Sequence, residues 1–234
     1  MKAIILAAGE GKRLRGYTND PKCLAEVNKE ALIVRMIKML KECGVRNIVI
    51  VVGYKAKKVI DKVKKHRLKV SFINNDDFGE GSILSLWRAR EHLNGSTLLI
   101  DSDTYFERDV IETVFRSKKQ NFFLIDQKSG NDDEAVRVGF TNGRAVRLAR
   151  GLSGDYGILG EWAGVTKFSL PGSRRLKALL EKKIIAGERQ AGYEFIIPDL
   201  FKSMTISYEL IDGLKWVEID FPKDLKKAKS LNID

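Results

Sequence analysis

Apolar residues in the first half of the chain occur in short continuous runs that alternate with amphipathic stretches. The runs have the length of buried strands and lie at residues 2–8, 47–53, 69–74 and 96–101. Apolar positions at helical spacing lie between them, at residues 31–43, 54–69 and from about 82 to 93. Strands that alternate with helices in this way predict an α/β fold with a doubly wound, mostly parallel sheet.

The second half of the chain has a different pattern, with many strand-like segments and few helices between them. The strand-like segments lie at residues 121–126, 135–140, 144–150, 161–169, 205–211 and 214–220, and helical patterns lie at about 171–186, 193–203 and 221–231. Turn signals at 141–143 and at Asp212-Gly213 separate neighbouring strands. We expect an antiparallel extension of the sheet within one domain that covers residues 1–234.

A glycine-rich loop follows the first strand in the stretch "LAAGEGKRL", which contains two cations. Arg13 stands where a Walker A motif needs Ser or Thr, and Leu14 occupies the third glycine position of a dinucleotide fingerprint, so both motifs fail. Glycines still let backbone N–H groups approach an anion, and ligands of open parallel sheets bind at this edge. We interpret the segment as a phosphate-binding loop to which Arg13 and Lys22 add cations; an ordinary strand-to-helix connection is the alternative.

Acidic residues end two of the predicted strands. Asp101 and Asp103 follow the apolar run "LLI", and Glu218 and Asp220 repeat the same spacing in "WVEIDFP". Residues two apart on a strand point to the same side, and carboxylates held that close repel unless a cation or a proton intervenes. One such pair is commonly a turn or a helix cap, but two pairs favour a hard-cation site with oxygen ligands, most simply Mg²⁺.

Composition and charge narrow the chemistry further. The chain has two cysteines and two histidines, which support neither a zinc site, nor a disulfide framework, nor a mechanism with a histidine base. Its formal net charge of +11 is compatible with nucleic acid, an anionic membrane or small anionic substrates, and we prefer a solvated helix face for the lysines of 54–69. No apolar run approaches the roughly 20 residues that span a bilayer, and the N-terminal stretch makes a poor signal peptide. We therefore expect a cytoplasmic protein.

The motifs "LAAGEGKRL", "PKCL", "VGY", "DSD", "GEWAGV" and "WVEIDFPKDL" together resemble the nucleotidyltransferase superfamily. The segment "EGSILSLWRARE" and the closing "EID" make the chain more similar to the phosphocholine cytidylyltransferase family and its relatives that act on other alcohol phosphates or phosphonates. The resemblance covers nearly the whole chain. It implies a Rossmann-like sheet of the nucleotide-diphospho-sugar transferase type, with a nucleotide-binding half at about 1–118 and an acceptor-binding half at about 119–234.

The resemblance also implies where the nucleotide binds. The base and triphosphate are expected on the loop and beside it, at Leu6, Ala7, Ala8, Gly9, Glu10, Gly11, Lys12 and Gly53. Ser82 and Ser85 share one helical face and are further nucleotide candidates, although helix capping is an equal explanation for Ser82.

The catalytic and metal-binding residues follow from the same resemblance. The expected catalytic residues are Lys22, Arg13 and Asp103, and the expected Mg²⁺ ligands are Asp103, Glu218 and Asp220. Lys22, in the motif "PK", is expected to contact phosphate. Asp101, the first aspartate of "DSD", is expected to have a structural role beside the metal ligands.

The acceptor pocket is expected to come from the second half of the chain. Its candidates are Asp126, Glu161, Trp162 and Tyr193, because an acidic residue and an aromatic face suit an acceptor that carries an ammonium group. Core packing is the alternative for Trp162, and Asp126 could simply end a strand. Residues 81–84 read "GSIL" where many phosphocholine-type members carry asparagine and tyrosine, so the sequence leaves the acceptor, and to a lesser degree the base, open.

The implied reaction is the Mg²⁺-dependent transfer of CMP from CTP to a small phosphate or phosphonate acceptor, with release of pyrophosphate. A phosphate monoester has a second pKa of about 6, so the acceptor is largely ionised near neutral pH and needs no general base. The first alternative is a sugar-1-phosphate nucleotidyltransferase that uses UTP, dTTP or GTP, and the second is a non-catalytic nucleotide- or nucleic-acid-binding protein. We expect no nucleic-acid partner and no membrane insertion; a homodimer is compatible with the sequence.

Overall fold

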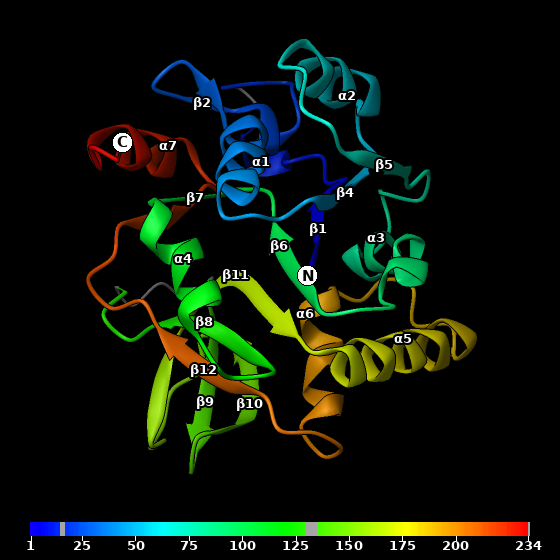
Figure 1. The fold of residues 1–234 in the computed structure, drawn as a ribbon, viewed down its shortest axis with the longest axis vertical. Helices are drawn as coiled ribbons and strands as arrows, with labels where there is room; N and C mark the ends of the chain where they lie inside the picture. Colours follow the sequence, from blue (N-terminus) through cyan, green and yellow to red (C-terminus); the bar gives the residue numbers. More distant parts are fainter. Residues whose placement is uncertain (15–16, 130–134, 234) are drawn as a thin grey trace.

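The computed structural model describes residues 1–14, 17–129 and 135–233, and a large sheet runs through its middle (Figure 1). Within these residues the sheet has nine strands, on a path β10-β9-β11-β6-β1-β4-β5 from which β8 and β12 branch at β11. Its parallel part consists of β5 (Ser71–Asn74), β4 (Asn47–Val52), β1 (Lys2–Ala7) and β6 (Thr97–Asp101). The four apolar runs of the first half therefore form the parallel strands, as expected.

A single long strand, β11 (Ile158–Phe168), joins the parallel part to the rest of the sheet. It pairs antiparallel with β8 along one edge, and along the other edge with β9 near its start and with β6 near its end. The strands that extend the sheet are β8 (Phe122–Asp126), β9 (Val136–Thr141), β10 (Arg144–Arg150) and β12 (Ser207–Leu210). The hairpin of β9 and β10 closes at residues 141–144. The expected antiparallel extension is confirmed for β8, β9, β10 and β11, whereas β12 pairs parallel with β8.

Helices cover both faces of the sheet, because the strands of the parallel part carry apolar side chains on both sides. In β1, Ile5 packs in one hydrophobic cluster and Ile4 in another. The first cluster includes residues of α1 (Leu32–Glu42), α2 (Ala56–Lys65) and α4 (Arg108–Arg116). The second includes residues of α3 (Ser82–Arg88), α5 (Leu170–Ile185) and α6 (Tyr193–Ile196). None of the helices in the described ranges is both long and apolar enough to cross a membrane.

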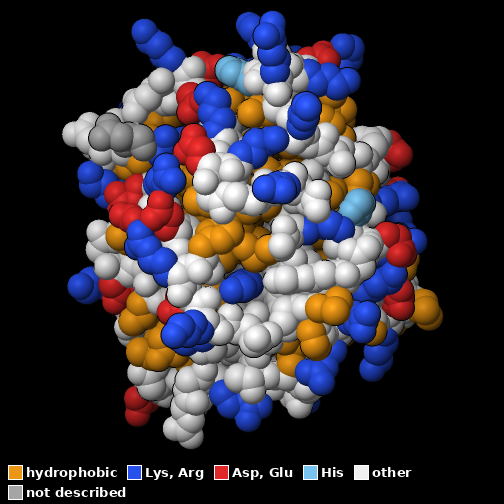
Figure 2. Space-filling model, in the orientation of Figure 1, with side chains coloured by type: hydrophobic (Ala, Val, Ile, Leu, Met, Phe, Trp, Pro, Cys, Tyr) orange, Lys and Arg blue, Asp and Glu red, His pale blue; other side chains and the backbone are white. Residues whose placement is uncertain are grey.

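The lysine-rich stretch forms α2, whose valine side chains are buried while most of its lysines face outward. Figure 2 shows these cations as blue side chains at the upper edge of the molecule, over α2. Several of them are paired locally: Lys57 Nζ lies 2.6 Å from Asp61, and Lys62 Nζ lies 2.7 Å from Glu26. The arrangement is that of the solvated helix face preferred from the sequence.

A third, smaller hydrophobic cluster joins the C-terminal elements to the N-terminal part of the chain. It packs α7 (Pro222–Ser230) against β2 (Glu26–Val27) and against the pair of β7 (Thr104–Phe106) and β13 (Trp216–Glu218). Figure 1 shows α7, in red, beside β2. β2 pairs with β3 (Glu30–Ala31), and short 3-10 helices lie at Lys12–Leu14, Lys22–Leu24, Arg90–His92 and Ile197–Leu200.

Some elements differ from the pattern in the sequence. The helix expected over 193–203 is a single α-helical turn, α6, followed by a 3-10 helix, because Pro198 has no N–H with which to continue α-helical bonding. The two strands on either side of Asp212 and Gly213 both form, but they do not pair with each other: β12 joins β8, and β13 joins β7. The pattern gave no indication of α4, β7 or the β2–β3 pair.

Candidate active site

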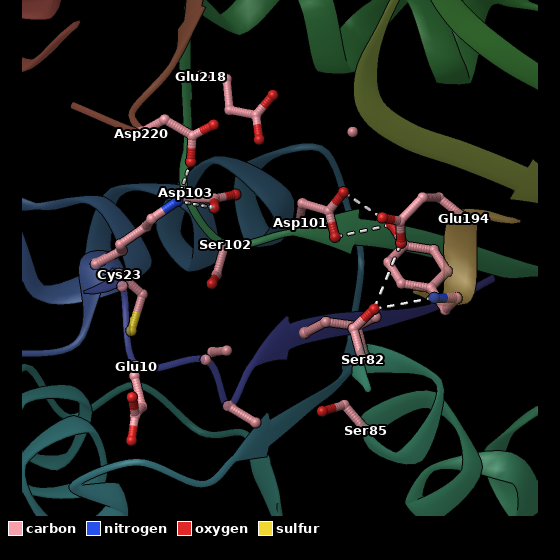
Figure 3. A pocket seen from close by; sticks show the side chains of 18 of the residues that line it. Glu10, Cys23, Ser82, Ser85, Asp101, Ser102, Asp103, Glu194, Glu218 and Asp220 are labelled. Atoms are coloured by element: carbon pink, nitrogen blue, oxygen red, sulfur yellow. Dashed lines mark hydrogen bonds and ion pairs between the residues drawn. The ribbon is translucent and has the colours of Figure 1, made fainter. Parts of the chain in front are cut away.

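A cavity of about 460 Å³ opens at the carboxyl ends of β1 and β6, the edge at which ligands of open parallel sheets bind. Figure 3 shows Asp103, Glu218 and Asp220 together at one end of this cavity, and Asp101 with Glu194 toward the other. The cavity is also lined by the expected nucleotide-binding and catalytic residues Leu6, Ala7, Ala8, Gly9, Glu10, Gly11, Lys12, Arg13, Lys22, Ser82 and Ser85.

The loop after β1 places the Lys22 side chain directly against Gly11. Gly11 has a φ of +65°, and a Cβ atom at this position would lie 2.5 Å from Lys22 Cγ. Leu14 N donates a 2.9 Å hydrogen bond to the Gly11 carbonyl and closes the first 3-10 turn. The missing side chain at Gly11 therefore allows the Lys22 stem to cross the loop toward the acidic residues.

Gly53, expected to contact the nucleotide, supports the loop from behind. A Cβ atom on Gly53 would lie 2.9 Å from the Ala8 carbonyl oxygen and 2.7 Å from Phe78 Cβ. Tyr54 N donates a 2.9 Å hydrogen bond to the same Ala8 oxygen. Gly53 is not among the residues that line the cavity, so its direct contact with a nucleotide remains a prediction.

Ser82 and Ser85 face the cavity but also have partners within the protein. Ser82 Oγ accepts a 2.9 Å hydrogen bond from Tyr193 N, and Ser85 Oγ accepts one of 3.1 Å from Asn75 Nδ2. Gly81 is the N-cap of α3, so Ser82 does not cap this helix. The hydroxyl of Ser82 instead joins the start of α3 to the start of α6, and base contacts by either serine remain predictions.

Carboxylates from two distant segments meet at one end of the cavity, and we call Asp103, Glu218 and Asp220 the acidic cluster. One oxygen from each of the three lies within 4.8 Å of the others. Lys22 Nζ lies 3.2 Å from Asp103 Oδ2 and also contacts Asp220 Oδ1, and Arg13 lies 3.1 Å from Asp220 Oδ2. The structure thus brings the predicted metal ligands together with both predicted catalytic cations.

β13 and α7 hold the two C-terminal acids of the cluster in place. β13 pairs antiparallel with β7, and Ile219 N donates a 2.9 Å hydrogen bond to the Asp103 carbonyl. Alternation along this segment buries Ile219 in the third hydrophobic cluster and turns Glu218 and Asp220 toward the cavity. Asp224 Oδ2 accepts hydrogen bonds of 3.1 Å and 2.7 Å from the backbone N–H groups of Asp220 and the residue after it, which fixes the start of α7.

The charges in the cluster act strongly on one another. Burial alone would lower the pKa of the Lys22 ammonium, but the carboxylates of Asp103 and Asp220 outweigh burial and raise it above its usual value. The pKa of Glu218 is raised by partial enclosure in the protein and by the charges of Asp103 and Asp220, although solvent still reaches its side chain. Such a cluster gains stability from a further positive charge placed among its oxygens.

The acidic cluster has the donor set of a hard divalent cation. All three members offer carboxylate oxygens, the ligands that Mg²⁺ and Ca²⁺ prefer over nitrogen and sulfur. Oxygens bound to one Mg²⁺ at about 2.1 Å lie at most about 4.2 Å apart, so the observed limit of 4.8 Å requires only small side-chain movements. The residues present therefore fit a divalent cation.

Asp101, two residues before the cluster, faces different partners. Both of its carboxylate oxygens accept 2.8 Å hydrogen bonds from the Tyr193 hydroxyl. Burial, and then the nearby charge of Asp103, raises the pKa of Asp101 well above its usual value. Gly164 has a φ of +69°, and a Cβ atom there would lie 3.1 Å from Asp101, so a glycine lets β11 pass this side chain closely. These contacts fit the structural role expected for Asp101.

The four predicted acceptor contacts lie on two cavities rather than one. Trp162 and Tyr193 line the main cavity, with their ring centroids 5.9 Å apart. Asp126 and Glu161 line a second cavity of about 570 Å³ that borders the acidic cluster from another side. The division follows from strand geometry, because Glu161 and Trp162 are neighbours on β11 and neighbouring side chains point to opposite faces.

Two of these residues also have packing partners. Asp126 is buried, and its oxygens accept 2.8 Å hydrogen bonds from Trp216 Nε1 and from Lys128 N. Trp162 is buried as well, and its Nε1 donates a 3.0 Å hydrogen bond to the Val165 carbonyl. These contacts agree with the packing explanations left open by the sequence, and acceptor contacts by either residue remain predictions.

Glu194, at the start of α6, is the main cavity residue that the sequence did not indicate. Its Oε2 atom lies 3.4 Å from Ser82 Oγ, and burial raises the pKa of its carboxyl. The available signal was an acidic residue next to Tyr193 in "GYEF". Tyr193 and Glu194 lie in the first turn of α6, which Ser82 joins to the start of α3, and both side chains line the cavity. Phe78, Glu80 and Arg150 also line it.

The chain is similar to known nucleotidyltransferases over most of its length. The sequence profile of the MobA-like NTP transferase domain matches residues 3–163. The choline-phosphate cytidylyltransferase of Streptococcus pneumoniae is 31% identical over 99% of this chain and 98% of its own length. The bifunctional IPC transferase and DIPP synthase of Aquifex aeolicus is 30% identical over 97% of this chain, which spans 50% of that relative.

The solved structure of the CTP:phosphocholine cytidylyltransferase from Streptococcus pneumoniae has the same fold. It superposes with a TM-score of 0.78 at 27% identity and covers 98% of both chains. The range matched by the profile, residues 3–163, spans the glycine-rich loop, Lys22 and Asp103, and the similarity to the Streptococcus pneumoniae enzyme covers 99% of the chain. The chain therefore belongs to the MobA-like NTP transferase family, and it is a nucleotidyltransferase.

Proposed function

We propose that this enzyme transfers CMP from CTP to a small acceptor that carries a phosphate or phosphonate group, and that it uses Mg²⁺. The observation that carries the proposal is the meeting of Lys22 and Arg13 with the acidic cluster at the end of a glycine-rich loop. Its choice of nucleotide and acceptor is supported by relatives that are cytidylyltransferases for choline phosphate and phosphoglutamine.

The reaction is a single displacement at the α-phosphorus of CTP. An oxygen of the acceptor's phosphate or phosphonate forms a bond to that phosphorus, and the bond from the phosphorus to the bridging oxygen of the β-phosphate breaks. The bonding electrons leave with pyrophosphate. Because the acceptor oxygen is already ionised near neutral pH, no side chain has to remove a proton, and catalysis reduces to positioning and charge neutralisation.

The residues of the cavity divide these tasks. The amides of the loop, with Gly9 and Gly11, bind the triphosphate. Lys22 and Arg13 neutralise charge on the α-phosphate and on the departing pyrophosphate. Asp103, Glu218 and Asp220 would hold Mg²⁺, which when bound would supply positive charge beside the phosphates of the two substrates.

The acceptor binds beside the α-phosphate, within reach of the second half of the chain. Trp162 and Tyr193 offer an aromatic wall in the main cavity, and Glu194 adds a carboxylate beside them. Asp126 and Glu161 are acceptor contacts in this proposal only if the acceptor extends into the second cavity. The substrates are small soluble anions, so we place the enzyme in the cytoplasm and expect neither nucleic acid nor membrane insertion; dimerisation stays a prediction.

A pyrophosphate-release screen tests the proposal. Purified enzyme is incubated with Mg²⁺, one of CTP, UTP, dTTP or GTP, and one acceptor from a panel of phosphocholine, phosphoethanolamine, inositol phosphate, aminoethylphosphonate and sugar-1-phosphates. We expect release only with CTP and an alcohol phosphate or phosphonate, and none when EDTA replaces Mg²⁺. Turnover of a sugar-1-phosphate, with no alcohol phosphate or phosphonate accepted, would instead identify a sugar nucleotidyltransferase.

A further inference from the structure

The Lys22 ammonium lies inside the acidic cluster rather than beside it. Its Nζ atom contacts Asp103 Oδ2 at 3.2 Å and also contacts Asp220 Oδ1. These oxygens belong to the side chains that lie within 4.8 Å of one another and fit a divalent cation. The lysine side chain is 17% exposed, and the two aspartates are 22% and 21% exposed, so the contact is largely withdrawn from solvent.

We propose that Lys22 is an internal counter-ion that holds the place of the divalent cation until nucleotide binds. The lysine and the cation compete for the same carboxylate oxygens, and nucleotide resolves the competition by giving the ammonium a phosphate to bind. The inference rests on the proposed function, because it takes the acidic cluster to be the metal site. It adds that metal and nucleotide bind as a linked pair.

The competition follows from size and charge. A divalent cation such as Mg²⁺ needs its oxygens at about 2.0–2.1 Å, whereas an ammonium needs them at about 2.7–2.9 Å. The gap between Asp103 and Asp220 therefore accepts either the ammonium or the metal ion. If both occupied it, their positive charges would repel each other. Arg13 differs from Lys22 because it contacts one member of the cluster, Asp220, and is 37% exposed. It neutralises the cluster from outside without filling the gap.

The Lys22 side chain is built to move. Its stem has four flexible methylene groups and a compact charge at the tip, while its backbone is fixed in the 3-10 helix Lys22–Leu24. The stem crosses the loop at Gly11, where a Cβ atom would collide with Lys22 Cγ. The same loop is the proposed triphosphate site, so a short swing carries the ammonium from carboxylates to phosphates.

Linkage of the two ligands follows from this exchange. Without nucleotide, the metal must displace Lys22 into water, and this opposes metal binding. The apparent affinity for metal is lower when fewer molecules have the gap between the carboxylates open. A nucleotide offers the displaced ammonium a new anionic partner and removes that opposition. By thermodynamic reciprocity, the metal then raises the affinity for nucleotide by the same factor.

Mn²⁺ binding without nucleotide tests the inference, with the free ion followed by electron paramagnetic resonance. We compare the wild type with Lys22→Met, which keeps the stem and removes the charge. The matched control is Lys12→Met, because Lys12 lies on the same loop and contacts Glu10 rather than the cluster. Lys22→Met is expected to bind Mn²⁺ about tenfold more tightly than the wild type, and Lys12→Met to stay within about twofold. An unchanged or weaker affinity in Lys22→Met, or an equal gain in both variants, overturns the inference.

Two further measurements separate the outcomes. If Lys22→Met is unfolded without metal, Mn²⁺ should restore its circular dichroism, and the concentration required gives the affinity; a variant that Mn²⁺ does not restore counts against the inference. Lys22→Arg keeps a cation and should bind Mn²⁺ as weakly as the wild type. The wild type with CTP must bind Mn²⁺ in either case: absence of binding there contradicts the proposed function, whereas binding there with no gain in Lys22→Met contradicts only the counter-ion.

Discussion

Single side chains divide the cavity into two chemically different ends. Asp101 and Asp103 are two residues apart in "DSD" and form a pair in the sequence. In the structure, Asp103 joins Glu218 in the acidic cluster, whereas Asp101 is partly buried and accepts hydrogen bonds from Tyr193. The partners of each carboxylate, rather than its position in the motif, decide what it can bind.

Asp103 gives the sharpest residue-scale prediction. Asp103→Asn keeps the shape of the side chain but removes its charge, so metal-dependent pyrophosphate release should fall by about 1000-fold, the scale of losing a well-placed electrostatic contact. The matched control is Asp109→Asn on α4, where the aspartate is exposed and pairs with Arg116; its rate should equal that of the wild type. Retention of full activity by Asp103→Asn would remove this residue from the mechanism.

The two cysteines should react very differently in the folded protein. Burial, followed by the charge of Asp103, raises the pKa of the Cys23 thiol to about 12, and the side chain is 2% exposed. Cys43 is only partly buried. Titration with Ellman's reagent at neutral pH should therefore detect one thiol in native protein and both after denaturation. Rapid reaction of both thiols in the native state would show that the Lys22–Leu24 turn opens.

The sequence predicted the charged residues of the site better than the side chains that surround them. Lys22, Asp103 and Asp220 lie in motifs whose residue types indicate phosphate or metal binding. The structure brings the three side chains together. Glu194 was missed because it reaches the cavity through the contact of α6 with α3, and Ser82 lies 112 positions away in the sequence. The bond between Asp126 and Trp216 was missed because it joins strands 90 positions apart, which no local pattern encodes.

At the scale of elements, the start of α7 supports the acidic cluster, the proposed metal site. Asp224 accepts hydrogen bonds from the backbone of Asp220 and the next residue, so it couples the end of β13 to the first turn of the helix. A carboxylate in the first turn also interacts favourably with the helix dipole. The orientation of a proposed metal ligand thus depends on a helix cap.

Asp224→Ala should weaken the site without removing any ligand. We expect a loss of about 1 kcal/mol in the free energy of unfolding, typical of a lost cap, and a Mn²⁺ affinity in the presence of CTP that is about 10- to 100-fold lower, as for residues that orient metal ligands. Lys226→Ala, on an exposed position of the same helix, is the control and should change neither quantity. If both variants behave alike, α7 has no part in orienting the cluster.

Helices and strands could be predicted from the sequence where burial requires a long run or a regular spacing of apolar residues. The runs that form β1 and β4 are apolar throughout because both of their faces are covered. β7 has three residues, too few for a period to be visible, and its partner β13 lies more than 100 positions away. β12 and β13 were both expected, but their partners were not, since pairing across the sheet depends on the packing of the whole fold.

At the scale of the molecule, the two halves of the chain are joined through one sheet. β11, from the second half, pairs with β6 from the first. The second hydrophobic cluster contains residues of both halves, Ile83 of α3 and Leu176 of α5 among them. A boundary near residue 118 therefore separates the proposed nucleotide-binding half from the proposed acceptor-binding half, but the two halves share one sheet and one hydrophobic cluster.

We expect the whole chain to unfold in one cooperative transition. Thermal unfolding followed by circular dichroism should coincide with unfolding followed by tryptophan fluorescence, because Trp87 lies in the first half and Trp162 and Trp216 lie in the second. Saturating CTP with Mg²⁺ should move both curves upward together. Two separated transitions would show that the halves are independent folding units.

The contact between Lys22 and Asp220 joins residues 198 positions apart. During synthesis, the loop and its lysine leave the ribosome long before the aspartate has been made, so a nascent chain carries nucleotide-binding parts with no means of using them. Proteolytic loss of the segment from β13 onward would return a finished molecule to that inert condition. Activity is therefore expected only after the segment from β13 onward has been synthesised and has packed beside the loop.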